Sequence, residues 1–533
     1  MRLKKYIILS SALMAFSLSS CSDYLDVKPT NAQTTESFYQ TEGQVDQALT
    51  GIYHDLLPMS LHYWYMSECR SDNTWAVSDA KRDIYDIAHF HTDTDLSEYN
   101  TCWGDYYELI AHCNAFLQNV EPFEMDATAK KQYLGEVHFL RALAYFDLVR
   151  YFGNIPKVDK VLDQAEALQL KQSDPAIIYN DVIIPDLNFA VENLLDVPIN
   201  YLGTPTTGHA CRVAALALRG KVYATMAGFP LEDISKKNLA VTDLKAVIDY
   251  AEKTGKYWAN GTGANGWPYI WVSDNDNKYH IFEIQYTNGG LGLGNVMVFN
   301  SLRDMNASQY TNVRIFGNTI YCEESLVETF GGIFNSLTGR YEFKGTDLRA
   351  EATLIFENIQ KNDGTYVNNE LPMIQKFFEH RIKRAALGFS DIDATIADYN
   401  DWPIDWPIIR LEDVMLLYAE LTGPTPEAVT LVNKIRNRVG LGNLKAEDTA
   451  SANAFDSVVS RERRLELASE GQRWFDEVRR NEWKELSKAK YIRRAVSAEA
   501  VENNVKDGMY LYPIPDDQMK VKDGLYVQNE AYR

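Results

Sequence analysis

One short cluster, residues 71–75 (SDNTW), combines the residue types that recognise a small polar ligand. It falls in a stretch that is predicted to be non-helical and to connect two helices. An indole face stacks on the C–H face of a sugar ring, and carboxylate and amide groups bind hydroxyls. We therefore predict that Trp75 stacks on a ligand and that Asp72 and Asn73 bind its hydroxyl groups.

A second aromatic group lies in the stretch 255–317, which is rich in glycine and is predicted to be a loop-rich insertion. Trp267, Tyr269 and Trp271 follow one another at alternate positions in its front half. Residues 282–286 alternate apolar and polar side chains, which predicts a strand. We predict that the three aromatic residues support Trp75 in the ligand-binding site.

Two polar segments have residue types that bind metal ions. His89-Phe90-His91 is followed by Asp93 and Asp95, but no distant segment provides an obvious further ligand, so solvated polar residues are favoured. Residues 274–277 (DNDN) offer hard oxygens of the kind Ca²⁺ prefers, without the glycine and terminal glutamate of an EF-hand loop. We predict no cofactor and no resident metal, with calcium at 274–277 as the alternative.

Catalysis has no positive support in the sequence. The nucleophile motif G-x-S-x-G and the zinc motif H-E-x-x-H do not occur. A pair of carboxylates about 5–10 Å apart would suffice for glycoside hydrolysis, and such a pair cannot be seen in a sequence. We predict that the protein is not an enzyme and keep a surface glycoside hydrolase as an alternative.

The composition excludes disorder of the whole chain, because 46% of the 533 residues are hydrophobic and 24% are charged. Acidic residues (74) outnumber basic residues (53), which gives a net charge of −21. A negative field repels phosphate backbones, so nucleic acid is not expected as the main ligand.

The first residues are predicted to be an export signal. Residues 1–20 contain a basic start, a short apolar segment and then Leu18-Ser19-Ser20 before Cys21, which resembles a bacterial lipobox. This pattern predicts cleavage before Cys21, acylation of Cys21 by chains such as palmitate, and a lipidated tether at 21–40. The five other cysteines include no C-x-x-C pair, and free buried thiols are favoured over a disulfide.

Helical periodicity dominates the remaining chain. Thr41 and Gln44 fit a capping box at the start of a first helix. Further helices are predicted at 97–121, 127–152, 175–195, 210–228, 239–253, 409–422, 425–439 and 453–482. Several form pairs with short glycine or proline joints, so we predict a mainly α fold, in which tetratricopeptide-like pairs form a scaffold with loop-rich insertions and little β-structure.

Several blocks of the sequence resemble one known family, the SusD/RagB outer-membrane nutrient-binding lipoproteins. The blocks are 139–153 (FLRALAYFDLVRYFG), 155–156 (IP), 409–414 (IRLEDV), 461–476 (RERRLELASEGQRWFD), 512–515 (YPIP) and 528–532 (QNEAY). Gln472 and Ala531 depart from the residues that are commoner in the family. The charges of 461–476 are expected to form buried pairs that fix helix packing rather than a ligand site.

The resemblance implies a fold, a location and a partner. It implies a single SusD-like helical domain at 41–533, with an N-terminal part at about 41–230 and a C-terminal part at about 255–533. It implies lipid anchoring in the outer membrane, facing the exterior, over a SusC-like TonB-dependent barrel. Such a protein binds an oligosaccharide, polysaccharide or peptide for import, through loops that correspond to 62–95 and 255–320. We predict a glycan ligand, with a peptide as the nearest alternative.

Overall fold

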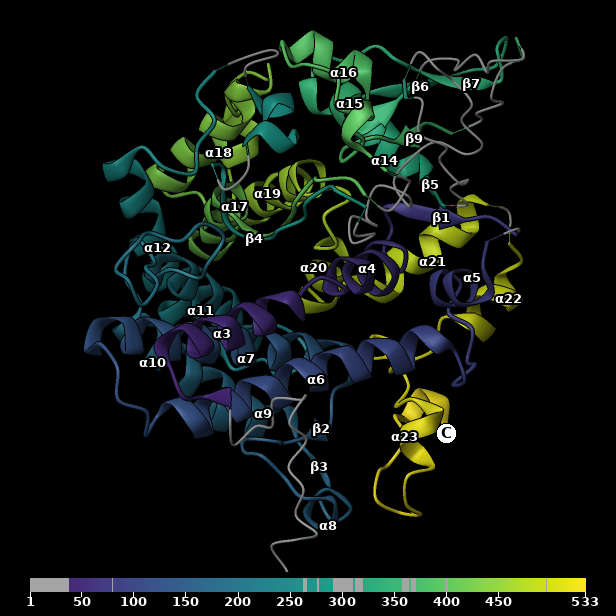
Figure 1. Ribbon diagram of the computed structural model, residues 1–533. Helices are drawn as coiled ribbons and strands as arrows, with labels where there is room; N and C mark the ends of the chain where they lie inside the picture. The colour runs from purple at the N-terminus through teal and green to yellow at the C-terminus, as the bar shows by residue number, and fades with distance from the viewer. Residues whose placement is uncertain are drawn as a thin grey trace, which may run out of the picture.

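The computed structural model of the protein (Figure 1) describes most of the chain. The described residues are 38–78, 80–261, 266–275, 278–290, 310–311, 320–356, 364–365, 371–397, 401–494 and 496–533. Cys21, the predicted signal and almost all of the predicted tether lie outside these residues. Within them, helices form the main body and the strands are short, which confirms the mainly α fold.

Helices of the first half run from the predicted capping box to the mid-chain insertion. They are α3 (Glu42–His54), α4 (Met59–Tyr63), α5 (Arg82–Ala88), α6 (Ser97–Val120), α7 (Ala127–Phe152), α8 (Gln164–Ala167), α9 (Pro175–Ile178), α10 (Ile184–Asn193), α11 (Arg212–Ala227) and α12 (Lys237–Thr254). The capping box of Thr41 and Gln44 is present at the start of α3. In Figure 1 the helices α6, α7, α10 and α11 lie in the lower half of the molecule.

The second half contains shorter helices. They are α14 (Glu324–Thr329), α15 (Leu348–Thr353), α16 (Arg381–Leu387), α17 (Leu411–Thr422), α18 (Pro426–Arg438), α19 (Ala452–Glu466), α20 (Arg473–Arg479), α21 (Trp483–Arg493), α22 (Ala498–Asn504) and α23 (Asp516–Met519). α17 packs against α11 and α12, so the helical layers of the two halves are continuous.

The strands occur in antiparallel pairs. They are β1 (Thr74–Ala76) with β5 (Ile320–Cys322), β2 (Ile155–Pro156) with β3 (Gln172–Ser173), β4 (His280–Ile284) with β10 (Trp406–Arg410), β6 (Gly332–Asn335) with β7 (Arg340–Phe343), and β8 (Leu354–Ile355) with β9 (Met373–Ile374). The strand predicted at 282–286 is found as β4, shifted by two residues. Two of the pairs, β1–β5 and β4–β10, join segments that are far apart in the sequence.

The joint between α17 and α18 shows how local sequence sets a helix pair. α17 ends at Gly423, whose φ of +68° is in the region that favours glycine. Thr425 then caps α18, because its side chain accepts a hydrogen bond from the amide of Ala428. Pro426 occupies the first position of α18, where a missing N–H costs nothing. The predicted antiparallel hairpin is therefore confirmed.

The single helix predicted at 453–482 is wrong, because the chain turns between α19 and α20. Ser469 and Gly471 in this turn have φ of +69° and +68°. The buried carboxylate of Glu68 accepts hydrogen bonds from the amides of Ser469 at 2.8 Å and Gly471 at 3.0 Å. A Cβ at position 471 would lie 2.7 Å from Tyr63, so glycine is required there. Tertiary contacts thus end a helix that periodicity alone would continue.

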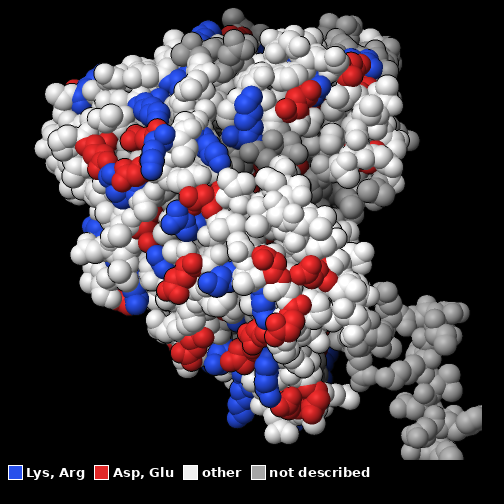
Figure 2. Space-filling model, turned by 60° about the vertical axis from the view of Figure 1, so that its left-hand side comes forward, with Lys and Arg blue, Asp and Glu red and all other residues white. Residues whose placement is uncertain are grey.

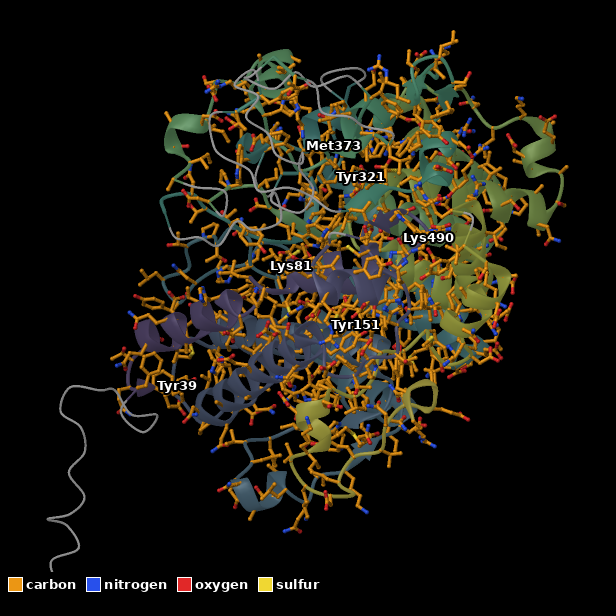
Figure 3. The ribbon with its side chains drawn as sticks, turned by 90° about the vertical axis from the view of Figure 1, so that its right-hand side faces the viewer. Tyr39, Lys81, Tyr151, Tyr321, Met373 and Lys490 are labelled. Carbon is orange, nitrogen blue, oxygen red and sulfur yellow. The ribbon has the colours of Figure 1, made fainter. Side chains whose placement is uncertain are left out.

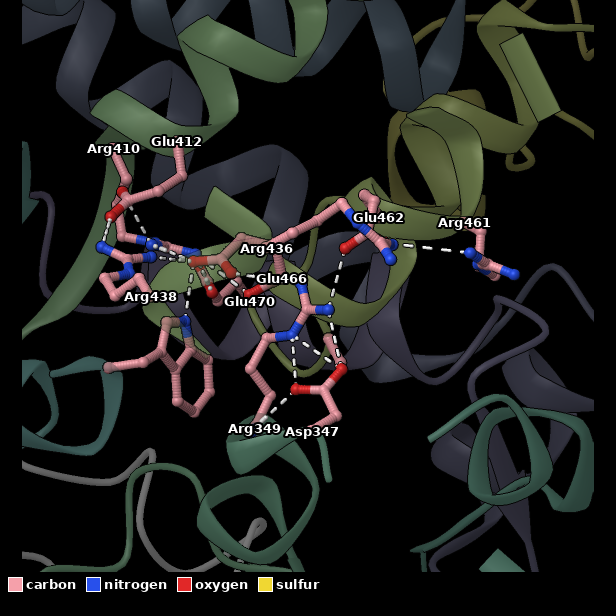
Figure 4. Close-up of polar contacts among 12 residues, drawn as sticks. Asp347, Arg349, Arg410, Glu412, Arg436, Arg438, Arg461, Glu462, Glu466 and Glu470 are labelled. Atoms are coloured by element: carbon pink, nitrogen blue, oxygen red, sulfur yellow. Dashed lines mark hydrogen bonds and ion pairs between the residues drawn. The ribbon is translucent and has the colours of Figure 1, made fainter. Parts of the chain in front are cut away.

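Buried charges join four elements of the second half, α15, β10, α18 and α19. Figure 4 shows Glu466 of α19 among cations from other elements. Its carboxylate lies 3.1 Å from Arg410, 2.9 Å from Arg438 and 3.4 Å from Arg349. Burial alone would raise the pKa of Glu466, but these cations hold it at about 2. The predicted packing role of the charges in 461–476 agrees with this geometry.

His62 of α4 lies between two carboxylates of α6. Its ring nitrogens are 2.8 Å from Glu98 and 2.8 Å from Asp105, and the residue is 2% exposed. Burial alone would lower its pKa, but the hydrogen bonds to Asp105 and Glu98 raise it from 6.5 to about 9. This interaction stabilises the folded protein fully below pH 6.5, and the stabilisation is lost as the pH rises through 9.

We expect His62→Gln to remove this pH dependence. A shift from 6.5 to about 9 corresponds to ~3 kcal/mol, because one pKa unit is about 1.4 kcal/mol. Urea unfolding from pH 6 to pH 9.5 should show the difference between wild type and variant shrinking by that amount. His112→Gln is the control, because His112 also pairs with a carboxylate, that of Asp55, but is about half exposed, so water screens the pair and the effect should be much smaller. A difference that stays constant over this range would contradict the assignment.

The described surface carries both signs of charge. Figure 2 shows acidic and basic side chains interspersed on one face, rather than one continuous acidic area there. No helix among the described residues is long and apolar enough to cross a membrane. The cysteines of the described chain are buried and free, which confirms the favoured interpretation: Cys69, Cys102, Cys113, Cys211 and Cys322.

Candidate ligand-binding site

The strand pair β1–β5 places two aromatic residues opposite each other. Trp75 pairs with Tyr321, and both are partly buried, whereas their neighbours within the strands are buried. Directly opposite residues of antiparallel strands point to the same face of the sheet. In Figure 1, β1 lies beside β5 at the right of the molecule, above α21. Trp75 and Tyr321 therefore share one face of the strand pair. We call this face, together with the adjoining Tyr491 and Arg494, the Trp75 surface.

Three side chains from the C-terminal ends of α5 and α21 surround the indole of Trp75. The ring of His89 meets it edge-on at 4.6 Å between centroids, and the ring of Tyr491 does so at 5.8 Å. The guanidinium of Arg494 lies 5.3 Å from the centroid of the indole. A cation above an aromatic face is attracted to it, so Arg494 brings hydrogen-bond donors to the edge of this surface.

His89 fixes β1 to the end of α5. Its Nε2 donates a hydrogen bond to the carbonyl of Ala76 at 2.8 Å, and its ring packs on Tyr85 at 4.2 Å. Burial lowers the pKa of His89 to about 4, so the imidazole is neutral near pH 7. His89 thus supports Trp75, and its Nε2 is engaged by the backbone of β1.

Asp72 and Asn73, which we predicted to bind ligand hydroxyls, are buried, with 4% and 1% exposed. Arg473 binds both oxygens of Asp72, at 2.8 and 3.0 Å. The amide of Asn73 donates to Glu68 and accepts from Arg464, each at 2.9 Å. In this arrangement their polar groups hold the start of β1, so the structure gives them a supporting position instead of a ligand-facing one.

Trp267 and Trp271 are also buried, at 0% and 1% exposed. The ammonium of Lys376 lies 4.8 Å from the ring of Trp267 and 4.5 Å from that of Trp271. The indole N–H of Trp267 donates to Glu466 at 2.7 Å. These two residues therefore pack around the buried charges of Figure 4 and present no ring face to a ligand in this structure.

Tyr269 differs from its neighbours because it is partly buried. Its ring stacks on Phe389, with 5.3 Å between centroids and 30° between planes. Among the described residues, no ring contact joins Trp75 to Trp267, Tyr269 or Trp271. The structure thus does not bring the six predicted residues together.

Three residues of the Trp75 surface were not found from the sequence. Tyr321, Tyr491 and Arg494 come from segments far from residue 75, and no local motif marks them. Around Tyr321 the sequence offers only the short apolar run Ile320-Tyr321-Cys322, which is too short to indicate a strand or its partner.

The structure places the two segments with possible metal ligands in different surroundings. Asp274 pairs with Arg384 at 2.7 Å, and residues 276–277 of the possible calcium segment lie outside the described residues. In the other segment, Asp86, His91 and Asp93 each place one ligand atom within 4.8 Å of the others. Arg82 already lies 3.4 Å from Asp86 and 3.3 Å from Asp93, so a guanidinium occupies the position a cation would take.

Two family models match the chain. Residues 280–532 match the SusD family, and residues 23–224 match the family described as starch-binding associating with outer membrane. Together these matches span most of the sequence, so the protein belongs to the SusD/RagB family. The family resemblance seen in the sequence is confirmed.

Individual relatives agree with this assignment. SusD-like protein P38 of Formosa agariphila is 26% identical over 491 residues, which cover 87% of this chain and 89% of that protein. A SusD homologue from Bacteroides thetaiotaomicron has a TM-score of 0.74 at 19% identity, covering 93% of this chain and 98% of its own. A laminarin-binding SusD-like protein has a TM-score of 0.67 at 22% identity, covering 93% and 100%. These solved structures share the fold.

Proposed function

We propose that this protein binds an oligosaccharide at the cell surface and delivers it to a SusC-like TonB-dependent outer-membrane transporter. The observation that carries the proposal is the pair Trp75 and Tyr321 on one face of β1–β5, in a member of the SusD/RagB family. Two aromatic side chains on one face suit the C–H faces of sugars, and Arg494 supplies donors for hydroxyl oxygens.

Two proteins of the same fold are named for what they bind. One is called a laminarin-binding SusD-like protein, and another is called surface glycan-binding protein A from Bacteroides fluxus. Their names support a glycan as the ligand proposed here. We assign the stacking role to Trp75 and Tyr321, and we assign Asp72 and Asn73 to holding β1 in place. The proposed role is capture without catalysis.

Titration calorimetry of residues 22–533 against neutral oligosaccharides and peptides tests this function. We expect one class of oligosaccharide to bind with a stoichiometry of one and to be recovered uncut. If only peptides bind, the ligand of this protein is a peptide and not a glycan. Cleavage products, detected by chromatography of each mixture, would show that the protein is a glycoside hydrolase.

Lipid anchoring is proposed from Cys21 and has its own test. We expect Cys21→Ser to abolish acylation, because the serine hydroxyl does not replace the thiol that carries the lipid, and to remove the protein from the membrane fraction. Palmitate labelling and fractionation of the expressing cells measure this. Thr30→Ala, in the predicted tether, should remain labelled. Full membrane association of the Cys21 variant would contradict lipid anchoring.

A further inference from the structure

A cavity of about 420 Å³ adjoins β1 on the side of Asp72. It lies among α14, α19 and α21, and its polar lining includes Asp72, Ser325, Glu328, Arg464, Lys490 and Arg493. Figure 3 looks onto this side of the molecule and labels Tyr321 and Lys490. Asp72 precedes Trp75 by three residues and lies in a turn, so the two residues are at most about 10 Å apart. The cavity is therefore within one or two sugar units of the aromatic pair.

Lys490 is a buried cation without a carboxylate partner. It is 2% exposed, and its ammonium donates to the backbone carbonyls of Ser71 at 2.9 Å and Arg70 at 3.4 Å. No carboxylate oxygen of the described residues lies within 4.0 Å of it. Burial lowers the pKa of Lys490 to about 8. A buried charge is costly unless it is paired, so this cation lacks the anion that its position calls for.

The carboxylates that act on Lys490 make their hydrogen bonds to other groups, although Glu323 and Glu477 each keep one buried oxygen without a partner among the described residues. Asp72 is bound by Arg473 through both oxygens, and Glu477 lies 3.3 Å from the same guanidinium. Burial and the charge of Asp72 raise the pKa of Glu477 well above its usual range, which weakens its negative charge. Glu323 accepts a hydrogen bond from the amide of Ser325 at the start of α14. These acids act on Lys490 only at longer range.

Two arginines add donors to the same cavity. Arg464 donates through Nε to Asn73 and through Nη2 to Asp72 and Ser325, while its Nη1 has no partner among the described residues. Arg493 stands at the rim, 42% exposed, and pairs with Glu328 at 3.0 Å. A carboxylate or sulfate group accepts several such hydrogen bonds at once.

We infer that this cavity binds the negatively charged substituent, a carboxylate or a sulfate ester, of an acidic oligosaccharide whose neighbouring ring stacks on Trp75 and Tyr321. This inference rests on the proposed function and specifies its substrate class. Lys490 and Arg464 contact the anion, and Arg493 closes the rim. The cavity lining contains three cations, Arg464, Lys490 and Arg493, and two carboxylates, Asp72 and Glu328, each of which is paired with an arginine.

Calorimetry with three matched tetrasaccharides tests the inference: an oligogalacturonate, a sulfated galactan fragment and neutral galactotetraose. We expect at least one acidic probe to bind with an affinity about tenfold or more above that of the neutral probe. A hydrogen bond to a charged group contributes enough binding free energy to raise the affinity by about that factor. Lys490→Met keeps the length of the side chain and should remove this preference without weakening the neutral probe. Lys488→Met, on the same helix but paired with Glu502 outside the cavity, is the matched control.

Several outcomes would overturn the inference while leaving the proposed function intact. One is equal affinity for acidic and neutral probes, and another is an acidic preference that survives Lys490→Met. If Lys490→Met does not fold, Arg493→Gln at the exposed rim should lower acidic affinity about threefold and leave neutral affinity unchanged. If no oligosaccharide binds, the proposed function fails. Sodium sulfate, compared with chloride at equal ionic strength, then tests the anion cavity alone, and no sulfate binding would overturn it.

Discussion

Replacing Glu466 by glutamine should lower the free energy of unfolding by about 3–5 kcal/mol. The substitution keeps the shape of the side chain but leaves Arg349, Arg410 and Arg438 without the carboxylate that they share. These guanidiniums are 0–1% exposed, so water cannot replace the lost charge. Urea unfolding followed by circular dichroism at pH 7 measures the change.

Glu447→Gln is the matched control for this substitution. Glu447 pairs with Lys445 at 3.5 Å, and both side chains are about three-quarters exposed. Such a pair contributes at most a few tenths of a kcal/mol. A loss of under 1 kcal/mol in Glu466→Gln would mean that the cations find other partners and that Glu466 is not the centre of the network.

Replacing Trp75 by alanine should weaken oligosaccharide binding by about 30-fold or more. A central aromatic contact removed by alanine costs about 2 kcal/mol or more, and that free energy corresponds to this factor. The effect should appear in the affinity measured by calorimetry for whichever oligosaccharide binds the wild type. Trp75→Phe keeps a ring on the same face and should retain part of the affinity.

Two controls separate binding from folding in this experiment. Trp75 also packs on His89 and Tyr491, so the thermal unfolding of each variant must be compared with wild type. Phe334→Ala removes an aromatic ring that is 50% exposed on β6, outside the proposed site, and should leave affinity unchanged. Unaltered affinity in a folded Trp75→Ala variant would remove Trp75 from the site.

The block of sequence that carries the strongest family resemblance also positions the proposed site. Arg464 and Arg473 of 461–476 bind Asn73 and Asp72, and the turn at 469–471 is held by Glu68. Substitution of Arg473 should therefore act on the proposed ligand binding indirectly, through the position of β1, whereas Arg464 also lines the proposed anion cavity. This explains why the motif identifies the scaffold while leaving the ligand open.

The sequence by itself determined the parts of the protein that depend on neighbours in the chain. The periodicity of apolar residues in the helices, the Thr41 capping box and the Gly423–Pro426 joint are local patterns. The structure contains the capping box and the joint as predicted. The break between α19 and α20 was missed because it depends on Glu68, about 400 positions away.

The exposure of the polar and aromatic residues could be read only from the folded chain. Asp72, Asn73 and Trp75 lie within four positions of one another. Asp72 is nevertheless buried in an ion pair with Arg473, Asn73 is buried in hydrogen bonds, and only Trp75 is partly exposed. Its partner Tyr321 is set by strand pairing across about 250 residues. Burial and long-range pairing are properties of the folded chain, and residue type and spacing do not encode them locally.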